Sequence, residues 1–312
     1  MINSKIKIIW TIIGNILLII SFIFIIYRIV QYKIDFSLLA SPFVILGLFF
    51  SAFIFGSSIF LTSFNFHWLL SVLSNVRIEK KLTVNIYCTS NLYKYLPGNV
   101  FQFVGRNRLA LENDKLSHTN VAIASLLDNI FLCIAALIIT VLCVFNFFTV
   151  YITQIKIPVF FFIITSALFI SCIIFLLVFR KRIKIRTTNV IHSLKNLKII
   201  SLSQLLLICI LRLLVVTFTF IITLFLLGQF FDLELILKTT GLFVLSWVAG
   251  FLTPGAPAGL GIREAILIMF LGNSLNINIL LPAAVIHRVV CIVGDIFAFV
   301  FGIGYFKYNK TV

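Results

Sequence analysis

Long apolar runs separated by short basic loops dominate this chain and constrain its fold more than any other feature. A helix needs about 20 apolar residues to cross the hydrocarbon core of a membrane. Six runs reach this length, at about 8–30, 38–64, 121–145, 157–179, 199–227 and 280–306. We therefore expect an all-α polytopic membrane protein with about six full transmembrane helices.

The composition supports this expectation and excludes other classes. Hydrophobic residues make up 62% of the chain, charged residues 11%, and the mean hydropathy is +1.19. Soluble domains carry roughly a quarter charged residues, so a soluble enzyme, a disordered chain and a secreted disulfide scaffold are all excluded. The six cysteines form no CxxC pair. They are expected to be small core residues, and neither a metal site nor a cofactor is predicted.

Two apolar stretches, 82–111 and 235–271, are broken by proline and glycine. Each half is about a dozen residues, too short to cross the membrane alone. Irregular backbone at membrane depth is tolerated only inside protein or beside a wet cavity. We predict two broken or re-entrant hairpins, giving six to eight spans, and the sequence leaves open whether they cross or return. The predicted turn residues are Pro97, Gly98, Gly105, Pro254, Gly255, Pro257, Gly259 and Gly261.

The distribution of basic residues predicts the orientation. The net charge is +16, and cytoplasmic loops beside anionic lipids account for such an excess without any nucleic acid. The loop 180–198 carries seven basic residues and no acid. This loop is therefore expected in the cytoplasm, and counting spans in both directions places both termini there too.

Four ionisable residues interrupt the predicted spans: Asp128, Arg212, Arg288 and Asp295. Such residues usually face the bundle interior and pair, because a charge near the bilayer centre costs a few kcal/mol. Arg288 and Asp295 are seven residues apart and share one helix face. A structural pair of Asp128 with Arg212 is the alternative to a functional role for those two. His287 is expected as a core hydrogen-bond partner and gives only weak evidence for a proton relay.

An arginine follows each of the two breaks. Arg106 either reaches an anionic group from a re-entrant turn or lies solvated in an interfacial turn. Arg263 opens an apolar segment, and a helix starting there would point free N–H groups at the broken loop, as at an anion site. Glu264 is equally suited to cap that helix. We expect a lipid phosphate to be bound by Arg106, Arg212, Arg263 and Arg288. Support or proton coupling is expected from Asp128, Glu264, His287 and Asp295.

The two broken motifs resemble those of a known family. Residues 95–106 read Tyr-Leu-Pro-Gly-Asn-Val-Phe-Gln-Phe-Val-Gly-Arg, and residues 254–264 read Pro-Gly-Ala-Pro-Ala-Gly-Leu-Gly-Ile-Arg-Glu. They look like the lysylphosphatidylglycerol synthase transmembrane family, the flippase-like half of bacterial aminoacyl-lipid synthases. The resemblance covers the whole chain in length and segment order, with one departure at Ala258, where the family usually has glycine. Because the sequence ends at Val312 without the aminoacyl-transferase domain, synthase activity is not expected.

The resemblance implies translocation of a lipid or lipid-linked glycan precursor across a bacterial or archaeal cytoplasmic membrane. The alternative is a membrane-embedded transferase, or an accessory subunit that holds a lipid phosphate for a separate glycosyltransferase. An enzyme needs a carboxylate or histidine at the broken loops, and only Glu264 qualifies. A structural scaffold would not explain so many buried arginines. No Walker lysine or nucleotide-binding glycine fingerprint is present, so ATP-driven pumping by this chain and enzymatic activity are not expected.

The spacing within the two motifs predicts an inverted repeat. The interval from Pro97 to Arg106 is nine residues, as is the interval from Pro254 to Arg263. Broken elements of opposite topology are typical of repeat-built transporters, whose site lies between the repeats. We expect one integral membrane domain, 1–312, with repeats of about 1–150 and 151–312 whose hairpin tips approach each other. An oligomer is compatible with the sequence.

Overall fold

The computed structural model describes residues 41–74, 78–96, 101–111, 116–154, 199–252 and 261–308, and all regular secondary structure in these residues is helical. The helices are α2 (Pro42–Ser74), α3 (Lys80–Asn91), the 3₁₀ helix η2 (Leu92–Tyr95), α4 (Phe101–Leu111), α5 (His118–Gln154), α8 (Ile199–Leu226), α9 (Leu233–Leu252), α10 (Ile262–Leu271) and α11 (Ile277–Tyr308). The expectation of an all-α polytopic membrane protein is confirmed.

Five of the described helices are long and apolar enough to cross a membrane. They lie at Pro42–Ser74, His118–Val144, Leu202–Leu226, Leu233–Phe251 and Ile277–Lys307. Four of these match predicted runs, those at about 38–64, 121–145, 199–227 and 280–306. The predicted runs at 8–30 and 157–179 lie outside the described residues, as does the loop 180–198. The orientation and the total of six to eight spans stay predictions.

The first broken stretch, 82–111, forms two short helices, as the sequence predicted. α3 has 12 residues and α4 has 11, and neither is long enough to cross a membrane alone. α4 packs against α3 and η2, so the two halves form a compact hairpin. Below we call α3, η2 and α4 the first hairpin.

The second broken stretch differs from the prediction in its first half. α9 has 20 residues and qualifies as a span, whereas α10 has only 10. The prediction of two halves of about a dozen residues is therefore wrong for α9. No proline interrupts residues 233–252, and the first proline after them is Pro254. Below we call α9 and α10, which pack together, the second hairpin.

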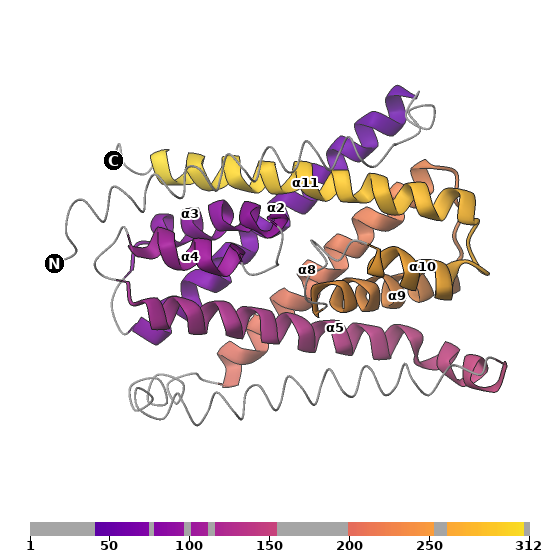
Figure 1. The fold of residues 1–312 in the computed structure, drawn as a ribbon, viewed down its shortest axis with the longest axis horizontal. Helices are drawn as coiled ribbons and strands as arrows, with labels where there is room; N and C mark the ends of the chain where they lie inside the picture. The colour runs from indigo at the N-terminus through magenta and orange to yellow at the C-terminus, as the bar shows by residue number, and fades with distance from the viewer. Residues whose placement is uncertain are drawn as a thin grey trace.

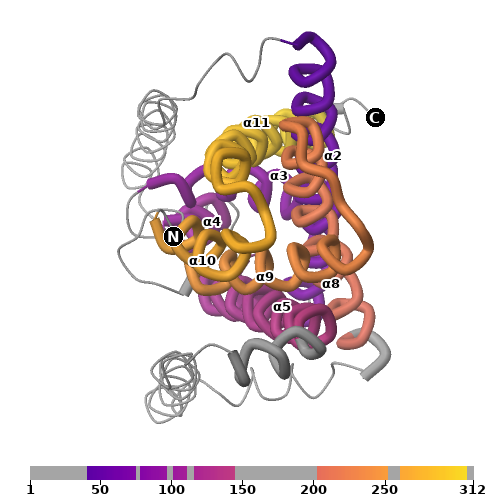
Figure 2. The backbone as a smooth tube through the Cα atoms, turned by 90° about the vertical axis from the view of Figure 1, so that its right-hand side faces the viewer, coloured from indigo at the N-terminus to yellow at the C-terminus, as the bar shows by residue number. Residues whose placement is uncertain are grey.

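The two hairpins lie between α11 and α5 (Figure 1). The first hairpin occupies one end of this space and the second hairpin the other, and the end view in Figure 2 shows α4 and α10 on the same side of the bundle. The residues at both breaks, 97–100 and 253–260, lie outside the described part of the chain. An inverted repeat relating the two halves is not tested by this arrangement and stays a prediction.

Among the described helices, α2 and α11 pack against each other most extensively. A Cβ atom on Gly56 would lie 2.4 Å from the carbonyl oxygen of Gly294, so neither helix tolerates a larger side chain at the crossing. Small residues at helix crossings allow such backbone approach in membranes. Aromatic rings follow along the same pair, with Phe297 packing edge-on against Phe49 at 5.2 Å. This crossing fixes the helix that carries His287, Arg288 and Asp295.

Candidate functional site

α11 carries Arg288 and Asp295 into the interior of the bundle. Both side chains are buried, and Asp295 has no exposed surface. The sequence predicted that these residues share a helix face and pair. They do pair, but with residues of two different hairpins and not with each other.

Asp295 binds the end of the first hairpin. Its Oδ1 accepts hydrogen bonds from Asn91 Nδ2 at 2.6 Å and from Lys94 Nζ at 2.8 Å. The Lys94 ammonium also lies 2.7 Å from Oδ2, to which the hydroxyl of Tyr95 donates. Neither Asn91 nor Lys94 was predicted as a site residue. The available signal was a lysine three residues before the Pro97–Gly98 break, where a charge at membrane depth needs a partner.

Arg288 binds the start of α10 in the second hairpin. Its Nε lies 2.6 Å from Glu264 Oε1, and its Nη2 donates to Glu264 Oε2 at 2.9 Å. The same Oε2 accepts the backbone N–H of Gly261 at 2.9 Å. Glu264 therefore caps α10, as one alternative from the sequence proposed, and also neutralises Arg288. It has no carboxylate oxygen left without a partner.

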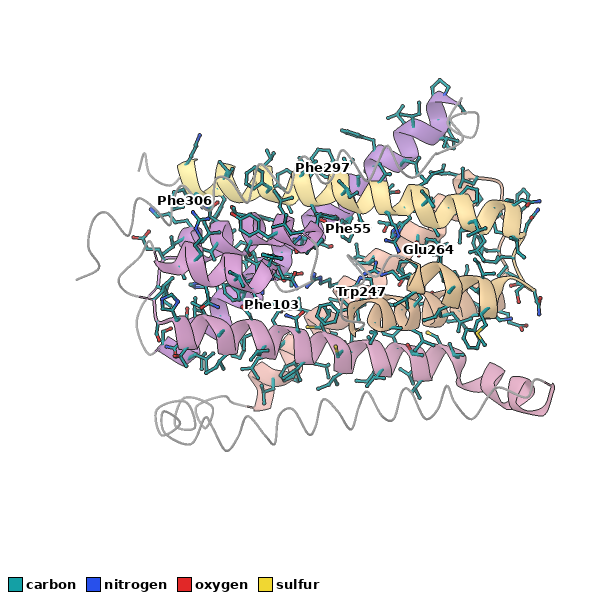
Figure 3. The ribbon with its side chains drawn as sticks, viewed as in Figure 1. Phe55, Phe103, Trp247, Glu264, Phe297 and Phe306 are labelled. Atoms are coloured by element: carbon teal, nitrogen blue, oxygen red, sulfur yellow. The ribbon has the colours of Figure 1, made fainter. Side chains whose placement is uncertain are left out.

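Arg263 lies beside this pair without a carboxylate of its own. Its guanidinium is 5.7 Å from the ring centroid of Trp247 on α9. Its Nε is buried and has no hydrogen-bond partner in the structure. No described carboxylate lies within ion-pair distance of Arg263, because Glu264 is held by Arg288. Figure 3 labels Trp247 and Glu264 at the end of the second hairpin that faces α3 and α4.

Tyr87 on α3 organises a second group of charges. Its hydroxyl donates to Asp128 Oδ2 at 3.1 Å and accepts from Arg212 Nη1 at 3.1 Å. The direct pair of Asp128 with Arg212 suggested by the sequence is therefore wrong. The tyrosine hydroxyl lies between the two charges and bonds to both, and the ion-pair partner of Asp128 is a different arginine, Arg106.

Arg106 completes this group from α4. Its Nη1 lies 3.9 Å from Asp128 Oδ2, its Nε donates to Ser90 Oγ at 3.2 Å, and its guanidinium stacks 4.1 Å from the centroid of the Tyr87 ring. Arg106 is only 2% exposed. The alternative of a solvated interfacial arginine is therefore wrong.

His287 is a core residue, as the sequence predicted. Its Nε2 is 3.0 Å from the hydroxyl of Thr219 on α8. Its ring packs edge-on against the stacked pair of Phe220 and Phe243, 5.3 Å from each centroid. The residue thus joins α8, α9 and α11 behind the charged groups.

Two of the predicted turn glycines are described, and the prediction of a turn is wrong for Gly105, which lies within α4. A Cβ atom on Gly105 would lie 1.9 Å from the ring of Tyr93, so this glycine permits α4 to pack on η2. Gly261 has a φ of +82°, a conformation that favours glycine, directly before α10. The other predicted turn residues, Pro97, Gly98, Pro254, Gly255, Pro257 and Gly259, lie outside the described residues.

The charges fall into two adjoining clusters. We call Lys94, Arg263, Glu264, Arg288 and Asp295 the α11 cluster, and Tyr87, Arg106, Asp128 and Arg212 the Tyr87 cluster. α3 connects them, because Ser90 binds Arg106 while the next residue, Asn91, binds Asp295. Among the described residues, no group of three His, Cys, Asp or Glu side chains is placed to hold a metal ion.

Comparisons with known proteins add no relative. No family model matches the sequence, and neither the curated proteins nor the solved structures contain a match. What the chain does is therefore inferred from the geometry of the two clusters and from the two sequence motifs.

Proposed function

We propose that the chain translocates an anionic lipid or a lipid-linked glycan precursor across the membrane, with Arg263 binding its phosphate. One observation carries this proposal. The Nε atom of Arg263 is buried and has no hydrogen-bond partner, while the neighbouring carboxylate of Glu264 is fully engaged by Arg288 and Gly261. A buried polar group without a partner is costly unless a ligand supplies one. The start of α10 adds N–H groups and a positive dipole end that favour an anion.

The other three predicted phosphate ligands have protein partners. Arg288 pairs with Glu264, Arg106 pairs with Asp128, and Arg212 bonds to Tyr87. We assign them to positioning the hairpins and to shaping the local charge. Arg263 is thus the arginine we expect to contact the substrate directly.

The arrangement of broken helices supports transport. Two Pro/Gly-broken hairpins lie at opposite ends of the space between α11 and α5 (Figure 1). Discontinuous helices that meet near the membrane centre line substrate sites in many transporters. The motif resemblance to the lysylphosphatidylglycerol synthase transmembrane family points the same way, toward lipid translocation in a bacterial or archaeal cytoplasmic membrane with both termini inside.

A transferase is the less supported alternative. Glu264 is the acid nearest the breaks, and its two oxygens accept from Arg288 and from the Gly261 amide. A general base needs a free lone pair directed at the substrate. The accessory-subunit alternative requires a separate glycosyltransferase partner.

Mass spectrometry of co-purified lipid tests the proposal. Wild-type protein purified in a neutral maltoside detergent should retain an anionic lipid, and Arg263→Ala should lose most of it. Lys307→Ala, at an exposed position in the last turn of α11, serves as the control and should retain the lipid. Equal retention by wild type and Arg263→Ala would contradict the assignment of Arg263.

A further inference from the structure

The α11 cluster has an odd number of charges. It contains three cations, Lys94, Arg263 and Arg288, and two carboxylates, Glu264 and Asp295, which leave a net charge of +1. Each carboxylate is paired with one cation, Asp295 with Lys94 and Glu264 with Arg288. The breaks at 97–100 and 253–260 contain no ionisable side chain, so they do not change this count. One positive charge, that of Arg263, remains uncompensated among the described residues.

Cys291 lies between Arg288 and Asp295 on α11. It follows Arg288 by three residues and precedes Asp295 by four, so all three share one face of α11. Arg288 is paired with the second hairpin through Glu264, and Asp295 with the first hairpin through Lys94. Ion pairs to both hairpins therefore flank Cys291 on α11.

The net charge limits what the site can neutralise. A phosphodiester carries one negative charge and brings the α11 cluster to zero. A phosphomonoester above its second pKa of about 6 carries two charges, and a diphosphate carries two or three. Either would leave a buried excess of negative charge, which is strongly unfavourable in a low-dielectric interior.

We infer that the site selects a lipid phosphodiester with a single negative charge and discriminates against phosphomonoesters and diphosphates. This inference rests on the proposed function and narrows its substrate class. A phospholipid headgroup and a polyprenyl phosphosugar both contain such a phosphodiester.

The Tyr87 cluster has the same charge balance. Arg106 and Arg212 face the single carboxylate of Asp128, again leaving +1. Asp128 Oδ1 and Arg106 Nη1 are both buried without a hydrogen-bond partner. A single negative charge thus satisfies either cluster, and a substrate passing from one to the other along α3 would meet the same net charge twice.

Binding titrations on the purified full chain in neutral maltoside detergent test the inference. Trp247, beside Arg263, provides a fluorescence signal. Four probes at pH 8 separate the classes: dioleoylphosphatidylglycerol, farnesyl phosphomannose, dioleoylphosphatidic acid and farnesyl diphosphate. The first two are phosphodiesters from the two sources. At least one of them should bind about tenfold or more tightly than the last two, a difference of about 1.4 kcal/mol.

Two substitutions change the charge count in opposite directions. Cys291→Asp lowers the net charge to zero and should reduce phosphodiester binding at least tenfold, whereas the isosteric control Cys291→Asn should bind like wild type. Glu264→Gln raises the net charge to +2 while keeping an oxygen acceptor for Gly261 and Arg288. This variant should move the preference toward the diphosphate. Thermal unfolding of each variant checks that it is folded. If Cys291→Asp does not fold, the titrations of Glu264→Gln alone test the inference.

The outcomes separate the inference from the proposed function. Equal affinity of the wild type for diphosphate and phosphodiester, or an unchanged preference in Glu264→Gln, would overturn the inferred selectivity for a single negative charge. Neither result would contradict the proposed lipid translocation. Absence of binding by all four probes, together with absence of co-purified anionic lipid, would overturn both.

Discussion

Arg288 and Asp295 lie two turns apart on one face of α11, and each holds a different hairpin. Arg288 fixes the start of α10 through Glu264, and Asp295 fixes η2 through Lys94. Seven residues at 1.5 Å per residue separate the two anchors by roughly 10 Å. One rigid helix thereby sets the distance between two elements that are some 170 residues apart in the sequence. A movement of α11 relative to either hairpin would have to break one of these ion pairs.

Removing the carboxylate at 295 should release the first hairpin. Asp295→Ala leaves Lys94 without its acceptor, and breaking a buried pair costs roughly 3–5 kcal/mol. Because the Lys94 side chain is 25% exposed, we expect a smaller loss of about 2 kcal/mol. Thermal unfolding in detergent measures it. The double variant Lys94→Met, Asp295→Ala should recover much of the loss, and a double variant no more stable than Asp295→Ala would contradict the pairing.

The hydroxyl of Tyr87 should matter more than its ring for the Tyr87 cluster. Tyr87→Phe keeps the stacking with Arg106 but removes the group that bonds to both Arg212 and Asp128. Leaving buried polar groups without partners costs about 1–3 kcal/mol, so the free energy of unfolding should fall by that amount. An unfolding free energy equal to that of the wild type would contradict this role of the Tyr87 hydroxyl.

The sequence predicted the helices better than the partners of their charges. Uninterrupted apolar runs identified α2, α5, α8 and α11, because length and hydropathy alone decide whether a helix can span a membrane. The breaks located both hairpins for a similar reason, since proline and glycine act locally. Arg106 and Asp128 lie on different helices, and their pairing depends on tertiary packing that no local pattern encodes.

The partners of the site residues could not be predicted from the sequence for the same reason. Arg288 and Asp295 were recognisable as buried charges, and their shared face followed from their spacing. Which residue neutralises each was not recognisable, because Lys94 and Asp295 are 201 residues apart. The role of Tyr87 was missed altogether, since a tyrosine in a short semi-apolar helix gives no signal that its hydroxyl bonds to two charges.

Packing of α4 on η2 should depend on Gly105. Gly105→Ala places a Cβ atom against the ring of Tyr93, and overpacking of this kind costs about 1–3 kcal/mol. A shift of α4 would also move Arg106, the next residue, so the variant should weaken the ion pair between Arg106 and Asp128. Gly304→Ala is a matched control, since nothing lies within 4 Å of its new methyl group. Equal unfolding temperatures for the two variants would show that Gly105 is not needed for this packing.

The basic loop 180–198 should face the cytoplasm. On a cysteine-free background, Ser193→Cys should resist an impermeant thiol reagent in intact cells and react after the cells are opened. A cysteine at 232, in the acidic turn before α9, should show the opposite behaviour. Labelling of residue 193 from outside would reverse the predicted orientation, including that of both termini.

Replacement of Arg263 should separate substrate binding from folding. Arg263→Ala removes a guanidinium that has no ion-pair partner among the described residues, so the protein should fold and keep its unfolding temperature while losing translocation of a fluorescent phosphatidylglycerol in proteoliposomes. Arg263→Lys should be impaired as well, because an ammonium cannot form the planar two-point contact with a phosphate or stack on Trp247 in the same way.

Arg288→Ala is the contrasting variant. It removes the ion-pair partner of Glu264, whose side chain is only 16% exposed, and should lower stability together with transport. If Arg263→Ala instead unfolds as readily as Arg288→Ala, Arg263 is a structural residue of the second hairpin, and the phosphate must be bound elsewhere.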